Sequence, residues 1–169
     1  MISKKNILII GAGYVGFSLS ICLSNKNNVT LIDTNKDKVK KIKLKTFNLN
    51  DNLIKHYIKN KKYKIQASYN LSNHIEENDI FILALPTNFI ERKKSFDTSL
   101  IEKTIKKIRL IKKNSLIVIK STTNIGCTEK LQKKFKTTNI IYAPEFIREG
   151  SALYDNLYPS RIIIGETLK

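Results

Sequence analysis

The feature that most restricts how this chain can fold is a glycine-rich turn between an apolar run and a helical pattern. Residues 7–10 read Ile-Leu-Ile-Ile, and residues 11–16 read Gly-Ala-Gly-Tyr-Val-Gly. Apolar residues then recur at helical spacing from Val15 to Leu23. A strand, Gly-x-Gly-x-x-Gly and a helix, in that order, are the fingerprint of a dinucleotide-binding turn. The stretch therefore predicts a dinucleotide site, and the alternative is a glycine-rich turn that binds nothing.

The positions of this turn have distinct physical tasks in that fingerprint. Gly11 permits the tight turn, Gly13 has no side chain to keep a pyrophosphate away from the backbone, and Gly16 lets helix and strand pack closely. Tyr14 and Val15 open the helix, where backbone N–H groups face an anion. We therefore expect this turn to hold the diphosphate of the cofactor.

An acidic residue ends the second strand-like run, residues 28–33. Asp33 follows Gly11 by 22 residues, close to the spacing of about 20 at which a carboxylate meets the adenosine ribose. A carboxylate accepts hydrogen bonds from both ribose hydroxyls and repels a 2′-phosphate, so Asp33 favours NAD over NADP. Lys36 and Lys38 lie close by and weaken that preference slightly. The alternative is an aspartate that only caps a helix or a turn.

Strand-like and helix-like segments alternate along the whole chain. The strand-like segments are residues 6–10, 28–33, 64–67, 79–85, 115–120, 139–142 and 161–164. Helical patterns lie between them, within 34–45, 53–58, 99–108 and 127–135. Ser99 and Glu102 are expected to form a capping box, and residues 88–96 a polar loop. This alternation predicts an α/β domain with a Rossmann-like, doubly wound parallel sheet.

Polar residues follow the ends of several predicted strands. In a doubly wound sheet, ligands bind beyond the carboxyl ends of the strands. Thr87 follows one buried strand, Thr122 follows the next, and Glu145 follows the one after that. Together with the glycine motif and Asp33 they make five polar features at one edge of the sheet. The sequence therefore predicts a single ligand site at this edge.

Two carboxylates follow Pro144 at a separation of four residues. If Pro144 opens a helical turn, Glu145 and Glu149 lie on one face of it. A carboxylate at a strand end beside a cofactor can act as a general base or position a water, and Thr122 could share that water. Alternatively, the two carboxylates only favour a helix N-terminus electrostatically. Their spacing alone does not decide between these interpretations.

Composition limits the class of protein. The chain has 169 residues, of which 41% are hydrophobic and 27% are charged, so a single globular domain is favoured over a disordered segment. A net charge of +17 could favour binding to nucleic acid, but the lysines are scattered and no nucleic-acid-binding signature accompanies them. No apolar run reaches the roughly 18 residues of a membrane span, and no signal peptide precedes the first strand. We therefore expect a cytoplasmic protein without a nucleic-acid or membrane partner.

Cysteine and histidine patterns predict neither a disulfide framework nor a metal site. Cys22 and Cys127 each fall on a predicted helix, and Cys127 fits a place in or near the core better than a nucleophilic role. His56 and His74 have no partners at ligand spacing and are expected on the surface.

Several longer motifs match one enzyme family over essentially the whole chain. Besides the glycine motif these are Leu85-Pro-Thr87, Lys120-Ser-Thr122, Pro144-Glu-Phe-Ile-Arg-Glu-Gly150 and Ala152-Leu-Tyr-Asp-Asn-Leu-Tyr-Pro-Ser-Arg161. The last two motifs are far more specific than the first. On these motifs the chain resembles the N-terminal, NAD-binding domain of the UDP-glucose/GDP-mannose dehydrogenase family. Within that family it is most similar to the bacterial enzymes that act on UDP-glucose.

The resemblance implies NAD-dependent, two-step oxidation of the C6 alcohol of UDP-glucose to the carboxylate of UDP-glucuronate. In that family a cysteine traps the aldehyde, which is oxidised to a thioester and hydrolysed. Related enzymes with a similar first domain oxidise UDP-N-acetylmannosamine or GDP-mannose. The implied cofactor is NAD, and the implied partner is a nucleotide sugar, UDP-glucose in the first place.

By motif position the resemblance also implies roles for individual residues. Asp33 and Lys38 would hold the adenosine ribose, and Thr87 and Thr122 would lie along the cofactor and the catalytic water. The implied catalytic residues are Thr122 and Glu145, and the implied substrate contacts are Glu145, Glu149 and the backbone of Ile147 and Arg148. The implied cofactor contacts are Gly11, Gly13, Tyr14, Val15, Gly16, Asp33, Lys38, Thr87, Thr122 and Glu149.

Two departures from the family pattern bear on activity. Asn124 stands where family members usually carry proline, so the loop after Thr122 loses a fixed φ angle. The family's nucleophilic cysteine lies in a downstream Cys-Phe-Pro-Lys-Asp segment that this sequence does not contain. We therefore expect residues 1–169 to be the apparently truncated cofactor half of an enzyme, inactive alone and completed by a C-terminal half in cis or in trans. The alternative is a non-catalytic NAD-binding module or remnant.

Overall fold

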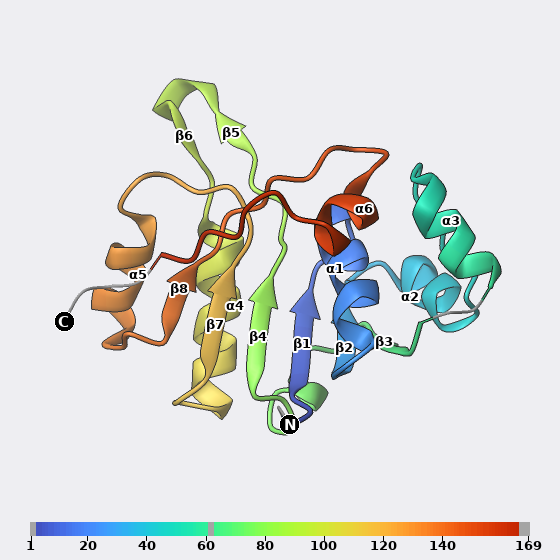
Figure 1. Cartoon of the computed structure of the whole chain (residues 1–169). Helices are drawn as coiled ribbons and strands as arrows, with labels where there is room; N and C mark the ends of the chain where they lie inside the picture. Colours follow the sequence, from blue (N-terminus) through green and yellow to red (C-terminus); the bar gives the residue numbers. More distant parts are fainter. Residues whose placement is uncertain (1–2, 61–62, 166–169) are drawn as a thin grey trace.

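Six parallel strands form one sheet in the computed structural model, which describes residues 3–60 and 63–165 (Figure 1). The strands are β1 (Asn6–Ile10), β2 (Asn28–Ile32), β3 (Ile65–Ser68), β4 (Ile80–Leu83), β7 (Leu116–Ile119) and β8 (Ile140–Tyr142). Their order across the sheet is β3-β2-β1-β4-β7-β8, and every neighbouring pair is parallel. This confirms the predicted doubly wound parallel sheet. The order reverses between β1 and β4, so the crevice for ligands is expected at their carboxyl ends.

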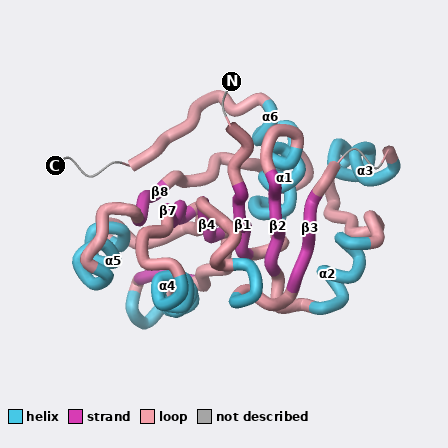
Figure 2. Tube along the Cα trace, turned by 90° about the horizontal axis from the view of Figure 1, so that it is seen from below, coloured by secondary structure: helices cyan, strands magenta, loops and turns pink. Residues whose placement is uncertain are grey.

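Helices cover both faces of the sheet. The helices are α1 (Tyr14–Ser24), α2 (Lys36–Lys43), α3 (Asn52–Lys59), α4 (Ser99–Ile111), α5 (Cys127–Phe135) and α6 (Ala152–Leu157), and a 3-10 turn η1 (Ser72–His74) lies between β3 and β4. Figure 2 shows α1, α3 and α6 on one side of the strands and α4 and α5 on the other. The parallel strands are rich in isoleucine and leucine, and helices on both sides keep those side chains from water.

The alternation of side chains along β1 divides the core in two. Ile7 and Ile9 enter one hydrophobic cluster, which α1, α2, α3 and α6 complete. Leu8 and Ile10 enter the other cluster, against α4 and α5. Successive side chains of a strand point to opposite faces, so one strand serves both clusters. The two clusters hold the sheet rigid behind its carboxyl edge, where the site forms.

A short antiparallel hairpin extends beyond the carboxyl edge, where the sequence predicts only a polar loop over 88–96 (Figure 1). It consists of β5 (Phe89–Ile90), a 3-10 turn η2 (Glu91–Lys93) and β6 (Ser95–Phe96). The rings of Phe89 and Phe96 meet edge to face with centroids 5.3 Å apart. Strands of two residues give no periodic signal, so the sequence pattern could not reveal them.

The prediction of a strand over 161–164 was wrong. These residues have no regular structure, and only Gly165 makes an isolated antiparallel bridge, with Tyr142. Ile162 is 75% exposed, and Ile163 and Ile164 are exposed as well. An apolar run resembles a buried strand in sequence, but this one gains no parallel neighbour among the described residues.

The capping box predicted for α4 was also wrong. Ser99 is the first residue inside the helix, and no side chain caps its N-cap position, Thr98. Instead the backbone N–H of Ser99 donates to Asp97 Oδ1 at 2.9 Å.

No helix of the described residues is long and apolar enough to cross a membrane.

Candidate functional site

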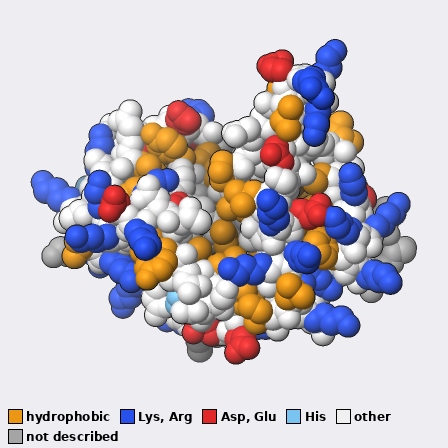
Figure 3. All heavy atoms as spheres, turned by 180° about the vertical axis from the view of Figure 1, so that it is seen from behind, with side chains coloured by type: hydrophobic (Ala, Val, Ile, Leu, Met, Phe, Trp, Pro, Cys, Tyr) orange, Lys and Arg blue, Asp and Glu red, His pale blue; other side chains and the backbone are white. Residues whose placement is uncertain are grey.

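A cavity of about 890 Å³ opens at the carboxyl ends of β1, β2 and β4. Its walls come from the glycine motif, the turn after β2, residues 69–71, residues 84–86 and one face of α4. Figure 3 shows a hollow with hydrophobic side chains on its floor and lysine or arginine side chains around it. A cavity of this kind suits a ligand that carries both flat rings and phosphate groups.

The glycines of the motif differ in what their missing side chains allow. Gly11 has a φ of 109°, and a Cβ there would lie 2.1 Å from the carbonyl oxygen of Ala84. A Cβ at Gly16 would lie 1.8 Å from the carbonyl oxygen of Gly11. Gly11 is therefore required by its positive φ and by the close approach of the turn to the backbone after β4, and Gly16 by the close approach of α1 to that turn. A Cβ at Gly13 would meet nothing within 4 Å, so Gly13 leaves open space for a ligand.

Helix α1 begins at this open space. Gly13 is its N-cap, no side chain caps the helix, and Phe17 N donates to the Gly13 carbonyl at 3.0 Å. The N–H groups of Tyr14 and Val15 precede that first bond and have no partner within the helix. The positive end of the helix dipole therefore faces a space that a diphosphate can enter.

Asp33 is fixed beside the glycine motif. Its Oδ2 accepts a hydrogen bond from Ala12 N at 2.9 Å, and its Oδ1 accepts one from Asn35 N at 2.9 Å. The Lys38 ammonium lies 3.7 Å from Oδ2, and the Asp33 side chain is 13% exposed. Each carboxylate oxygen keeps a lone pair for a hydroxyl donor. The helix-cap alternative is wrong for Asp33, because Asn35 is the residue that caps α2. The bond from Asn35 N shows that Asp33 does hold the turn after β2, as the turn alternative predicted.

One face of α4 closes the cavity, and the sequence reasoning missed it. Leu100, Lys103, Thr104 and Lys107 line this wall. Their spacing of three and four residues places them on a single helix face. That spacing could have been found in the sequence, but only the topology shows that the face borders the cavity. The two ammonium groups add positive charge beside an anionic ligand.

A second polar cluster lies where β7 and β8 end. Ile119 and Tyr142 are opposite each other in the paired strands, so the residues just beyond them meet. Lys120 Nζ lies 3.0 Å from Glu145 Oε2 and 3.4 Å from the Pro144 carbonyl oxygen. The two charged side chains are only 14% and 15% exposed. No role was predicted for Lys120, because nothing in its local sequence shows that it meets Glu145.

The segment after β8 is not helical. Residues 143–148 have irregular backbone, and residues 149–150 form a turn. The expectation that Glu145 and Glu149 share one face of a helical turn was therefore wrong. Glu145 is largely enclosed, whereas Glu149 is exposed, so the two carboxylates have different surroundings.

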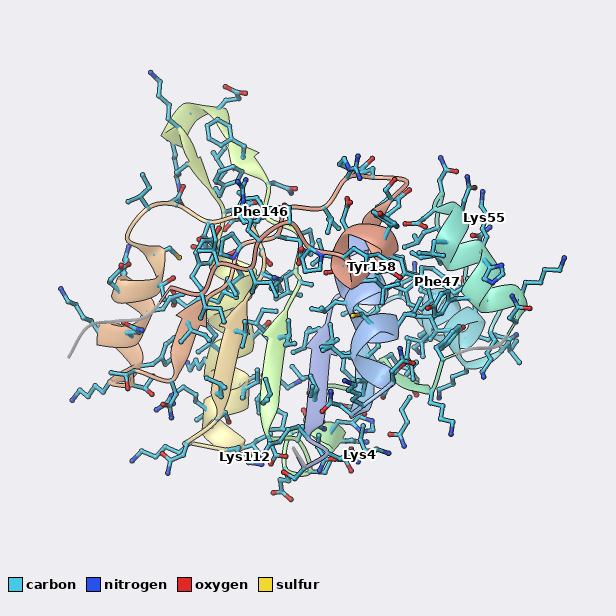
Figure 4. The ribbon with its side chains drawn as sticks, viewed as in Figure 1. Lys4, Phe47, Lys55, Lys112, Phe146 and Tyr158 are labelled. Carbon is cyan, nitrogen blue, oxygen red and sulfur yellow. The ribbon has the colours of Figure 1, made fainter. Side chains whose placement is uncertain are left out.

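Arg148 lies in this irregular segment, where its backbone and side chain both bind Asp155 on α6. Its backbone N–H donates to Asp155 Oδ2 at 2.9 Å, and its guanidinium donates to Oδ1 at 2.7 Å and to Oδ2 at 3.2 Å. The side-chain bond, followed by the backbone bond, lowers the pKa of Asp155, and the same pairing raises the pKa of Arg148. Nearby, the Arg161 guanidinium lies 4.4 Å from the centre of the Phe146 ring. Figure 4 shows Phe146 at the carboxyl edge of the sheet, opposite the edge with Lys4 and Lys112.

Asn124 ties the loop after β7 to the hairpin. Its Nδ2 donates to the Phe96 carbonyl at 3.0 Å, and its Oδ1 accepts from Phe96 N at 2.8 Å. This pair of bonds imitates the pairing of two strands. The loop after Thr122 lacks the fixed φ angle of a proline, as the sequence indicated, but these two bonds connect it to the hairpin instead.

The cavity unites only part of the predicted site. Its lining includes Gly11, Gly13, Tyr14, Val15, Asp33 and Lys38. Gly16 is not part of the lining but packs against the Gly11 carbonyl. The lining does not include Thr87, Thr122, Glu145, Ile147, Arg148 and Glu149, which follow β4, β7 and β8 at the same edge. Their contacts with a cofactor or a sugar stay predictions.

Neither cysteine suits a nucleophilic role. Cys22 and Cys127 are free thiols, and burial is the main cause that raises the pKa of each. The thiolate is the reactive form, so a raised pKa makes both less reactive. Cys127 packs against the hydrophobic cluster of α4 and α5, as its position on a helix predicted. Within residues 3–60 and 63–165, no group of three His, Cys, Asp or Glu could hold a metal ion.

Comparison with known proteins agrees with this geometry. Residues 5–169 match the model of the UDP-glucose/GDP-mannose dehydrogenase family, NAD binding domain. The UDP-glucose 6-dehydrogenase of Campylobacter jejuni subsp. jejuni is 41% identical over 162 residues, which are 95% of this chain and 41% of that protein. The UDP-glucose 6-dehydrogenase of Streptococcus pneumoniae is also 41% identical, over 96% of this chain and 41% of its own length. This chain thus spans about two fifths of the curated relatives it matches.

Solved structures share the fold. A UDP-glucose dehydrogenase from the archaeon Pyrobaculum islandicum has a TM-score of 0.81 at 24% identity, over 96% of this chain and 41% of that one. The GDP-mannose dehydrogenase of Pseudomonas aeruginosa has a TM-score of 0.80 at 20% identity, over 95% and 41% of the two chains. The family match covers nearly every residue, and the glycine turn and Asp33 have the geometry of a dinucleotide site. The chain therefore belongs to the UDP-glucose/GDP-mannose dehydrogenase family, as its NAD-binding domain.

Proposed function

We propose that this chain supplies the NAD-binding half of an enzyme that oxidises UDP-glucose to UDP-glucuronate. The observation that carries the proposal is the placement of two features at one sheet edge. One is the cavity beside Gly13 and Asp33, and the other is the enclosed carboxylate of Glu145 beyond a nearby strand. Oxidation of an alcohol needs a hydride acceptor and a group that takes a proton.

The residues of the cavity fit NAD. The open space at Gly13 and the unpaired N–H groups of Tyr14 and Val15 suit the diphosphate. The fixed carboxylate of Asp33 suits a ribose with two free hydroxyls and opposes a 2′-phosphate. When bound, NAD supplies the hydride acceptor of the reaction. The residues of this chain bind and orient it.

Glu145 and Thr122 are the proposed proton-handling pair. They follow β8 and β7, which are adjacent in the sheet. In this proposal the carboxylate of Glu145 accepts a proton from a water or an alcohol, and the hydroxyl of Thr122 hydrogen-bonds that same group. Glu149 and the backbone at Ile147 would contact the nucleotide sugar, while the backbone N–H of Arg148 already donates to Asp155.

The choice of UDP-glucose rests on the relatives that bear that name at 41% identity. Family structures named for GDP-mannose and for UDP-N-acetylmannosamine have the same fold, so these two sugars are the competing substrates. The chain spans 41% of the first relatives, and the remainder would supply the other sugar contacts and the nucleophile.

The test is an activity screen of residues 1–169 mixed with the C-terminal segment of the Campylobacter jejuni relative that lies beyond its match to this chain. We expect NADH formation with UDP-glucose, less with the other two nucleotide sugars, and none from the chain alone. Turnover of UDP-glucose by residues 1–169 alone would overturn the need for a second half. NAD binding without turnover in any mixture would favour the alternative, a non-catalytic NAD-binding module.

A further inference from the structure

The ion pair between Lys120 and Glu145 is unusually enclosed for this molecule. Both side chains are less than one fifth exposed. Every other ion pair between described residues has at least one partner more than one fifth exposed. Exposed pairs contribute little to stability, whereas an enclosed charge that loses its partner is costly. Lys120 therefore compensates the negative charge of Glu145, which would destabilise the fold if it were left unpaired.

The two oxygens of the Glu145 carboxylate have different surroundings. Oε2 has less than 1 Å² of accessible surface and makes no hydrogen bond with good geometry. The ammonium of Lys120, 3.0 Å away, is its charged neighbour. Oε1 has only a long contact of 3.3 Å with the N–H of Phe146, the next residue. Oε1 is therefore the oxygen that can meet a ligand.

Lys120 also holds the backbone beside Glu145. Its Nζ lies 3.4 Å from the Pro144 carbonyl oxygen. One ammonium thus contacts both the main chain before Glu145 and the side chain of Glu145, from the end of the neighbouring strand. In a segment without helical hydrogen bonds, these two contacts restrict where the carboxylate can lie.

We propose that Lys120 is a positioning residue for the reaction, which holds Oε2 of Glu145 so that Oε1 faces the water or the sugar alcohol. This inference rests on the proposed function, because it gives a purpose to the carboxylate proposed there. It adds a residue whose task is to act through Glu145 and not on the substrate itself.

The test compares Lys120→Met, Lys120→Arg, Glu145→Gln and the double variant Lys120→Met/Glu145→Gln with the wild type. Lys113→Met is the matched control, since Lys113 is an exposed lysine just before the same strand. Urea unfolding and NAD titration are measured on residues 1–169. The kcat and KM values are measured after addition of the same C-terminal segment of the Campylobacter jejuni relative.

We expect Lys120→Met to lower kcat at least about tenfold while KM for NAD and NAD affinity change less than about twofold. Lys120→Arg, which keeps the charge, should recover most of the lost kcat. The double variant should be more stable than Lys120→Met, because no lone charge remains, yet its kcat should be no better than that of Glu145→Gln. A kcat for Lys120→Met within twofold of the control would overturn the proposal.

The stability comparison keeps this inference separate from the proposed function. It needs no turnover, so it can be read even if no mixture oxidises a sugar. If the changes in the free energy of unfolding caused by Lys120→Met and Glu145→Gln add up in the double variant, the two side chains do not interact, and the proposal is overturned. Coupled stability effects combined with a dead wild-type mixture would overturn the proposed function.

Discussion

At the scale of single residues, the glycine turn separates the demands of folding from those of binding. Gly11 and Gly16 are enforced by backbone carbonyls about 2 Å from where a Cβ would lie. Gly13 faces open space and is free of any packing demand. The motif predicts a role for each of the three glycines, but only the structure shows which of them the fold itself requires.

The first prediction compares Gly13→Ala with Gly16→Ala. Gly13→Ala should change the free energy of unfolding by less than about 1 kcal/mol but weaken NAD binding at least about tenfold, because the methyl group enters the ligand space. Gly16→Ala should cost about 3 kcal/mol or more, since its methyl group meets backbone. Urea unfolding and calorimetric titration measure both. Undiminished NAD affinity in Gly13→Ala would mean that the diphosphate lies elsewhere.

A second prediction at this scale concerns Asn124→Ala. The substitution removes both hydrogen bonds to Phe96, so it should cost about 1 kcal/mol and speed amide exchange at Phe96. Amide hydrogen exchange measures the effect directly. Asn114→Ala, at an exposed asparagine before β7, is the control. Equal exchange at Phe96 in the two variants would show that the cross-link is absent in solution.

At the scale of elements, one buried carboxylate joins two helices. Asp51 is 1% exposed, and its Oδ1 accepts from Leu53 N and Ile54 N at the start of α3. Its Oδ2 accepts from Leu153 N at the start of α6. A carboxylate with two oxygens can satisfy the N-termini of both helices at once. It thus links α6, which follows the segment with Glu145, to the start of α3.

The third prediction follows from this double cap. Asp51→Ala should cost about 2–4 kcal/mol, because it leaves buried N–H groups of two helices without acceptors. Asn35→Ala removes the cap of α2 alone, at an exposed site, and should cost about 1 kcal/mol. Urea unfolding of the two variants is the measurement. Equal losses would show that α6 does not depend on Asp51.

The fourth prediction concerns pH and the pairing of α6 with the segment before it. The Arg148 side chain, then its backbone N–H, lowers the pKa of Asp155 below its ordinary value. A lowered pKa in the folded state gives stability that is present above the unfolded pKa and lost as pH falls through the folded pKa. The stability gap between wild type and Asp155→Asn should therefore be constant near neutral pH and shrink below about pH 4. A gap that does not change down to pH 3 would contradict this pairing.

The elements also show how far sequence patterns reach. The buried strands and their helices were predictable because runs such as 80–83 and 116–119 are apolar and bounded by turn residues. The exposed run 161–164 ends in three isoleucines, so the pattern alone could not exclude a buried strand there. The prediction of a helical turn after Pro144 was wrong because local spacing does not show contacts with other elements. Side chains from distant elements, Lys120 and Asp155, bind that segment's backbone, and no local pattern reports them.

At the scale of the whole molecule, the fold brings its two polar clusters to one edge. The cavity lies at β1, β2 and β4, and the Lys120–Glu145 pair lies beyond β7 and β8. The edge at which these polar residues lie was predictable, because topology sends every parallel strand end there. Glu145 was among the predicted residues, but its pairing with Lys120 was not, because Lys120 becomes informative only beside Glu145. The net charge of +17 would favour the arrival of anionic cofactors and nucleotide sugars.

The most direct test of the central claim is calorimetric titration of residues 1–169 with NAD and with NADP, repeated on Asp33→Ala. We expect one NAD per chain, bound at least about tenfold more tightly than NADP, and a preference that disappears in Asp33→Ala. Absence of NAD binding, or NADP bound as tightly as NAD by the wild-type chain, would contradict it.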